Sequence, residues 1–323
     1  MKTMTIRGCL FCVAATVLWC SSNAVASPPG VVTERMMIDQ FGYLPAMTKI
    51  AVIASPQVGF NAPQNYTPGA VLEVRTWPDH QSALSGVVTA WNNGATHDQS
   101  GDKVWWFDFS MLTRPGSYYI YDPRNDTRSH VFDISVNVYN DALKQATRMY
   151  FYQRSGFAKR LPFADARWID AASHPHDARA RLVTAPNDAS TEKDLSGGLF
   201  DAGDYNKYVT FTMETLSDLL FAYRNNPEVW GDNFDLPESG NGVPDILDEI
   251  KWELDWLLKM QNADGSVLSK LSVTQYQHTS PPSADSAPRY YGAASTSATL
   301  AGAASFAHAA LAFNSINTAY AEL

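Results

Sequence analysis

The distribution of apolar positions changes near residue 137. From Val31 to about Val136, apolar residues come in short alternating runs bounded by Pro, Gly, Asn and Asp, without helical periodicity between them. Such runs at short intervals are typical of a β-sandwich. The predicted strands cover Lys49 to Ala54, Val71 to Trp77, Val104 to Phe109, Tyr118 to Tyr121 and Val131 to Val136. We therefore expect residues 27–137 to form an immunoglobulin-like β-sandwich.

After Asn137 the apolar residues recur with a period of 3.6, which predicts helices. The clearest helix starts at Val243, with Pro244 in its first turn. Its apolar stripe consists of Ile246, Leu247, Ile250, Leu254, Leu257 and Leu258. Further helices are predicted over residues 138–153, 208–224 and 295–313. We expect residues 138–323 to form a helical domain whose connections are long, polar loops.

The first 26 residues have the pattern of a secretory signal peptide. Lys2 and Arg7 precede an apolar run from Cys9 to Trp19, and the small residues Ala24, Val25 and Ala26 follow. The apolar run is about half the ~20 residues that a membrane-spanning helix needs. We expect cleavage after Ala26 and a secreted or periplasmic protein without a membrane anchor. A lipoprotein signal acylated at Cys20 is the alternative, which the bulky residue before that cysteine disfavours.

Composition narrows the classes of partner. All three cysteines lie in the signal segment, so the mature chain has no disulfide and no cysteine-ligated zinc. The chain has 24 basic and 33 acidic residues, and loss of Lys2 and Arg7 with the signal changes the formal charge from -9 to -11. This charge repels nucleic acid and anionic membranes, whereas a neutral polysaccharide is unaffected.

The chemistry is concentrated in one loop, Gly197 to Val209, with the sequence GGLFDAGDYNKYV. Asp201 and Asp204 flank the flexible Gly203, so both side chains can point at one water. One carboxylate can then hold the water while the other removes its proton. Neighbouring carboxylates also alter each other's proton affinity. For the tetrapeptide alone, an aspartate cap with a turn glycine is the alternative interpretation.

The whole loop resembles the signature of glycoside hydrolase family 9, Gly-Gly-x-x-Asp-Ala-Gly-Asp-Tyr-x-Lys-Tyr. The segments Asp39 to Pro45, Tyr152 to Gly156, Glu238 to Asp245 and Trp256 to Gln261 also resemble that family and occur in its order. The resemblance covers essentially the whole mature chain. It implies an immunoglobulin-like module followed by the first part of an (α/α)6 barrel.

The resemblance also implies an activity, namely inverting hydrolysis of β-1,4-glucosidic bonds in cellulose or related β-glucans. By motif match, Asp204 is the general base and Asp201 its water-positioning partner, and no cofactor is required. Inversion also needs a general acid, with the two carboxyl groups ~6.5–9.5 Å apart. In the family this acid is a glutamate near the C-terminal end of the barrel, and the matching motif is absent from residues 1–323.

The final segment still has a helical pattern at Leu323, so we expect a truncated barrel. Residues 27–323 alone are then expected to be inactive, with the Ile246/Leu254/Leu257 stripe partly uncovered. We expect the full-length protein to be a monomer. Two alternatives stay open: an exo-acting cellobiohydrolase, glucosidase or glucosaminidase, and a non-catalytic carbohydrate-binding fragment. The intact carboxylate pair disfavours the second.

The sequence bears on the binding of two metals, calcium and zinc. Asp232, Asp235 and Asp245 lie in an oxygen-rich loop of the composition that calcium prefers, although the spacing is not that of a standard calcium loop. Caps and turn residues are the alternative. Some relatives hold a structural zinc with cysteines and histidines, but Ser155 stands where a cysteine would be needed. Zinc is therefore not expected.

Loop residues of two other kinds remain. Tyr205 adjoins the predicted base, and we expect it to bind substrate because the apolar face of a sugar stacks on an aromatic ring. Trp168 and Tyr290 also lie in predicted loops. His174 and His176 are expected at the surface or near the cleft.

Overall fold

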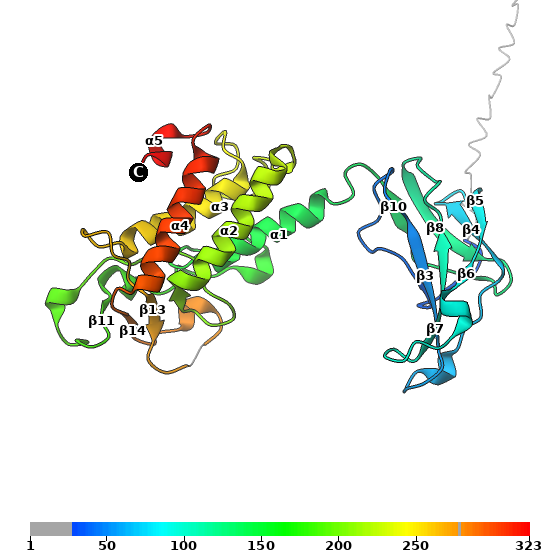
Figure 1. The fold of residues 1–323 in the computed structure, drawn as a ribbon, viewed down its shortest axis with the longest axis horizontal. Coiled ribbons are helices and arrows are strands. Elements are labelled where there is room, and N and C mark those ends of the chain that lie inside the picture. The colour runs from blue at the N-terminus through cyan, green and yellow to red at the C-terminus, as the bar shows by residue number, and fades with distance from the viewer. Residues whose placement is uncertain (1–27, 277–278) are drawn as a thin grey trace, which may run out of the picture. The chain divides into compact units, whose positions relative to one another are not determined.

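The computed structural model describes residues 28–276 and 279–323. The chain divides into two compact units, one ending at Tyr139 and the other starting at Asn140 (Figure 1). The predicted signal peptide, residues 1–26, lies outside the described residues. Within the described part of the chain, no helix is long and apolar enough to cross a membrane.

The first unit is a β-sandwich, as predicted. One sheet has the order β1-β9-β8-β4-β5, with β10 also paired to β8, and the other has the order β2-β3-β7-β6. The strands are β1 (Val31–Val32), β2 (Met36–Met37), β3 (Ile50–Pro56), β4 (Val71–Thr76), β5 (Ser82–Val87), β6 (Thr89–Ala90), β7 (Asp102–Asp108), β8 (Gly116–Asp122), β9 (Thr127–Arg128) and β10 (Phe132–Ile134). The edge strand β5 was not predicted, because its small and polar residues show no apolar alternation.

Alternation along the strands produces the core of the sandwich. On β7, Phe107 is fully buried while its neighbour Trp106 lies on the outer face. Residues from both sheets meet in one apolar cluster, including Ile53, Leu72 and Ile120. This unit therefore has a core of its own.

The second unit contains the predicted helices within a few residues of their expected bounds. They are α1 (Asn140–Gln153), α2 (Val209–Asn225), α3 (Asp245–Met260) and α4 (Thr296–Phe313), followed by the short α5 (Thr318–Ala321). Helices α2 and α4 lie side by side (Figure 1). The expectation that the α3 stripe is partly uncovered is wrong, because Ile246, Leu254 and Leu257 are buried in a cluster with residues of α2 and α4.

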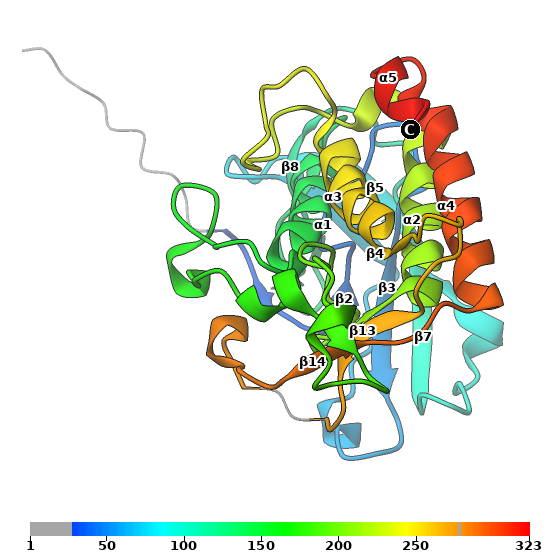
Figure 2. The ribbon, with the colours of Figure 1, turned by 90° about the vertical axis from the view of Figure 1, so that its left-hand side faces the viewer.

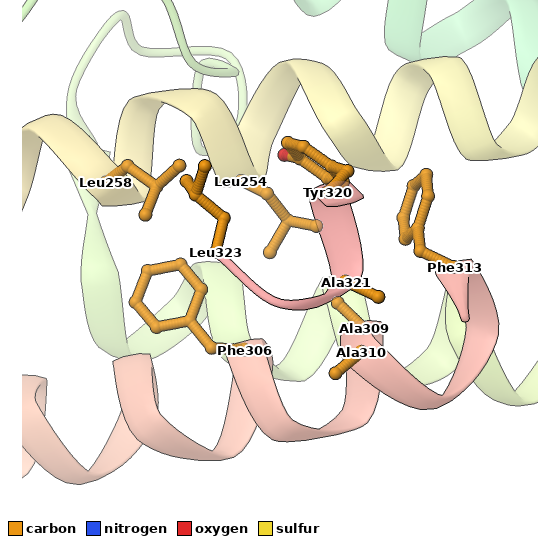
Figure 3. Close-up of a pocket in the computed structure, with 9 residues that line it drawn as sticks. All are labelled: Leu254, Leu258, Phe306, Ala309, Ala310, Phe313, Tyr320, Ala321 and Leu323. Carbon is orange, nitrogen blue, oxygen red and sulfur yellow. The ribbon is translucent and has the colours of Figure 1, made fainter. Parts of the chain in front are cut away.

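Near the C-terminus, α3, α4 and α5 enclose a small apolar hollow of about 70 Å³. Leu254 and Leu258 of α3 face Phe306 of α4 and Tyr320 of α5 there (Figure 3). The Tyr320 hydroxyl donates to Asp255 at 2.9 Å, outside the apolar contacts. With no other titratable side chain in its walls, this hollow is part of the packing between helices.

The loops of the second unit contain a small sheet that was not predicted. Its order is β11-β14-β13-β12, with β11 (Arg181–Leu182), β12 (Lys207–Tyr208), β13 (Lys270–Val273) and β14 (Arg289–Tyr291). The sheet lies at one end of the helices (Figures 1 and 2). Tyr208 and Tyr290 are thus strand residues, not parts of a helix and a loop. Strands of two to four residues are too short to show alternation in sequence.

Candidate active site

The loop that carries both predicted carboxylates is fixed at its two ends. At the first end, the N–H of Leu199 donates to Glu253 Oε2 at 2.5 Å, and the N–H of Phe200 donates to the carbonyl of Gln153 at 2.9 Å. At the other end, Lys207 of β12 pairs with Leu271 of β13. The intervening residues are therefore presented on a rigid support.

Within the loop, Asn206 links the two carboxylate residues. Its side-chain amide donates to Asp204 Oδ2 at 2.5 Å, and its backbone carbonyl accepts from the N–H of Asp201 at 2.9 Å. Its side-chain oxygen accepts from the N–H of Val273 on β13 at 3.0 Å. Asn206 is only 2% exposed. This role was not predicted, because Asn206 occupies the unspecified position of the motif.

The structure brings Asp201 and Asp204 close enough to interact electrostatically. Partial desolvation raises the pKa of Asp201, and the negative charge of Asp204 raises it further. Asp201 lines a hollow of about 290 Å³ with Phe200, Phe211 and Glu253. A water in this hollow can be held by the Asp201 carboxylate, with Asp204 three residues further along the same loop.

Tyr205 forms part of an aromatic wall next to Asp204. Its ring lies 5.0 Å from that of Phe200 and 5.4 Å from that of His174, measured between centroids. Its hydroxyl donates to the carbonyl of Thr279 at 3.2 Å. The side chain is half-buried, so a partner can reach only part of the ring.

The two histidines differ in environment. His176 is exposed, whereas His174 is buried against Phe200 and Tyr205 with its backbone at a φ of 49°. Burial, together with the positive charge of Arg289, lowers the pKa of His174 to about 4. His174 is therefore neutral at pH 7 and lies near the candidate site, not at the surface.

A layer of buried charges supports the loop from below. Lys207 is fully buried and donates to Asp177 Oδ2 at 3.1 Å and to the carbonyls of Leu195 and Gly197 at 3.0 and 2.6 Å. Desolvation lowers its pKa to about 8. The Nε of Arg289 lies 3.2 Å from Asp177 Oδ1. The lysine of the motif thus positions the loop, and only its place in the motif distinguished it in the sequence.

Helices α1 and α3 are joined by a second buried cluster. Arg154 donates from Nε to Glu249 Oε2 at 2.9 Å and from its two terminal nitrogens to Glu238 at 2.8 and 3.0 Å. Arg154 and Glu249 are both fully buried. Because Gln153 and Arg154 are adjacent, this cluster also fixes the carbonyl that anchors the catalytic loop.

The three carboxylates considered for calcium have separate partners. Asp232 accepts from the N–H groups of two loop glycines at 2.6 and 2.7 Å. Asp245 accepts from Phe234 N–H at 2.5 Å and from Ser239, and Asp235 pairs with Lys144 at 2.5 Å. Among the described residues, no group of three or more His, Cys, Asp or Glu is arranged to hold a metal.

Comparison with protein families gives two matches along the chain. The profile of the cellulase N-terminal ig-like domain matches residues 32–126, and that of glycosyl hydrolase family 9 matches residues 139–323. The first match lies within the first structural unit, and the second match covers the whole of the second unit.

Individual relatives agree with these matches. Endoglucanase D of Acetivibrio thermocellus is 29% identical over 90% of this chain and 43% of its own length. A cellulose 1,4-beta-cellobiosidase of the same organism is 32% identical over 84% of this chain and 33% of its own. The crystal structure of a metagenome-derived glycoside hydrolase family 9 endoglucanase superposes with a TM-score of 0.74 at 35% identity, covering 89% of this chain and 51% of that one. The chain spans less than half the length of these curated relatives.

Proposed function

The chain belongs to glycosyl hydrolase family 9, and we propose that it supplies the base side of an inverting hydrolase of β-1,4-glucosidic bonds in cellulose or related β-glucans. Asp204 acts as the general base and Asp201 holds the water. One observation carries the proposal: buried Asn206 donates from its side chain to the Asp204 carboxylate and accepts from the backbone N–H of Asp201, so the base is oriented and the main chain that bears Asp201 is fixed beside it.

The mechanism follows from this placement. Asp204 removes a proton from the water as its oxygen attacks the anomeric carbon on the face opposite the leaving group. A single displacement of this kind inverts the configuration. The leaving oxygen needs a proton from an acid on the other face, and we assign no such acid among the described residues. The reaction requires no cofactor, because every step is a proton transfer or a nucleophilic attack.

A substrate that needs no acid tests the base by itself. The fluoride of β-cellobiosyl fluoride departs without a proton, so residues 27–323 should hydrolyse this compound even if they are inactive on cellulose. We expect fluoride release to fall strongly in Asp204→Asn and the variant to keep its melting temperature. Equal rates in both proteins would exclude Asp204 as the base. Failure of the unsubstituted chain to hydrolyse the fluoride would favour the non-catalytic alternative.

Endo or exo action is decided separately. The similar proteins include both an endoglucanase and a cellobiosidase by name. We propose endo action on a neutral β-glucan as the leading case. With the full-length protein, a rapid loss of viscosity of carboxymethylcellulose per bond cleaved would support endo action, and release of cellobiose alone would favour the exo alternative.

Two accessory features belong to the proposal. We propose export through cleavage after Ala26, which N-terminal sequencing of the mature protein tests. A structural calcium at the Asp232 loop also remains a prediction, although Asp232 already accepts from two backbone N–H groups. Its test is the melting temperature with calcium and with a chelator.

A further inference from the structure

A second, larger hollow adjoins the candidate active site. It has a volume of about 560 Å³, which lies in the range of small-molecule pockets. Phe200, the residue before Asp201, lines both this hollow and the smaller one that contains Asp201. The two hollows are therefore neighbours with one shared wall. The other apolar walls are Tyr152, Phe157, Trp168, Ile169, Pro281 and Pro282.

Trp168 has the most exposed aromatic ring in this hollow. Its side chain is 62% exposed, although it ends a short turn, Ala166–Trp168, that is well fixed. Asp165 caps the turn by accepting from Arg167 N–H at 2.8 Å, and Trp168 N–H donates to the carbonyl of Asp165 at 2.9 Å. Binding of an apolar surface over a large, exposed indole on a rigid support is favourable, because it removes apolar area from water.

The charged groups of the hollow are already engaged. The Lys159 ammonium donates to the carbonyls of Arg154 and Phe157, both at 2.8 Å, and Arg167 pairs with Asp165. Asp170 accepts from the N–H and the hydroxyl of Ser283. The hollow therefore suits an uncharged ligand. A carboxylate offers about four acceptor positions, so Asp170 can still accept from a ligand hydroxyl.

We propose that Trp168 is the stacking platform of a remote subsite, which binds a pyranose ring of the same β-glucan chain whose scissile bond lies at Asp204. The inference rests on the proposed function. A β-linked glucose ring presents C–H groups on its faces and hydroxyls around its rim, which matches an indole with a carboxylate nearby. Phe200 connects the two places, because it lines both the Asp201 hollow and the Trp168 hollow.

The remote subsite should contribute to the binding of long oligosaccharides and not to the binding of a disaccharide. Isothermal titration of residues 27–323 with cellohexaose should show about tenfold weaker binding in Trp168→Ala, equivalent to ~1.4 kcal/mol. Trp168→Phe should recover most of the affinity. Hydrolysis of β-cellobiosyl fluoride should be unchanged in Trp168→Ala, since a disaccharide engaged at Asp204 leaves the remote subsite empty. Trp106→Ala is the matched control, because Trp106 lies on the sandwich and is 44% exposed.

Each contrary result has a distinct meaning. Unchanged cellohexaose binding in Trp168→Ala would overturn the subsite while fluoride hydrolysis still supported the proposed function. If Trp168→Ala lost fluoride hydrolysis to the same degree as cellohexaose binding, the remote subsite would also be overturned. Trp168 would then belong to the reacting subsite. If the unsubstituted chain neither bound cellohexaose nor hydrolysed the fluoride, the proposed function and the subsite would both fail.

Discussion

The side-chain amide of Asn206 donates a hydrogen bond of 2.5 Å to Oδ2 of Asp204. The orientation of this amide is fixed, because its oxygen accepts from the N–H of Val273 and the reversed amide would place two donors together. Asp204 therefore receives a donor whose direction is set by β13. A base that is held in this way needs little reorganisation when it takes a proton.

Removal of this amide should affect both rate and stability. We expect Asn206→Ala to slow hydrolysis of β-cellobiosyl fluoride and to lower the free energy of unfolding by about 1–3 kcal/mol, because Val273 N–H loses its acceptor in a buried site. Kinetics and urea unfolding measure the two effects. If the fully folded variant kept the wild-type kcat, Asn206 would have a structural role only.

The two aspartates should differ in their contributions. General base catalysis contributes about 10²–10⁴ in rate, so Asp204→Asn should lose that factor on β-cellobiosyl fluoride. Asp201→Asn should also be impaired, but less, because an amide can still hold a water. Steady-state kinetics on both folded variants compare them. A larger loss in Asp201→Asn would reverse the two assigned roles.

The stereochemistry of the product is a separate prediction. Attack by water in a single displacement should release α-cellobiose first from β-cellobiosyl fluoride. Proton NMR during the first minutes distinguishes the anomers before they equilibrate. Early appearance of the β-anomer would indicate a retaining mechanism and contradict the assignment of Asp204 as a base acting through water.

Glu253 should make stability depend on pH. Burial raises its pKa from 4.5 to about 7 in the folded protein, against two hydrogen bonds and the charge of Lys207 that lower it. Between pH 4.5 and 7 the folded state therefore holds a proton that the unfolded state has lost, and stability falls as pH rises. Relative to Glu253→Gln, the wild type should lose on the order of 3 kcal/mol over this range. Urea unfolding at a series of pH values measures this difference. If the free energies of unfolding of the wild type and Glu253→Gln changed in parallel with pH, Glu253 would be ionised in the folded state.

The Arg154 cluster should be the most sensitive to truncation. Arg154→Ala leaves Glu249 buried without its partner, which typically costs 3–5 kcal/mol. Arg167→Ala breaks only an exposed pair with Asp165 and should leave the unfolding midpoint nearly unchanged. Urea unfolding of the two variants gives the comparison. Similar small effects would mean that the interior around Glu249 admits water.

Local patterns predicted the four long helices and five strands of the sandwich. The α3 stripe repeats every three or four residues, and the long strands β3 and β7 contain apolar runs, so their bounds agree with the structure within a few residues. The loop with Asp201 and Asp204 could also be found, because its signature is contiguous. The missed strands are short or poor in apolar residues and show no periodicity; they are β1, β2, β5, β6 and β9 of the sandwich and the small sheet.

The sequence by itself determined the two-part organisation, the helices and the loop that bears the carboxylates, because each depends on neighbouring residues. Only the tertiary structure decided which distant residues meet. Asn206 binds Val273 across 67 positions, and Arg154 binds Glu249 across 95. Such pairs form because buried donors and acceptors must find partners once the chain is compact, and that requirement leaves no periodic trace in the sequence. The same holds for His174 and Lys207, whose lowered pKa values come from burial.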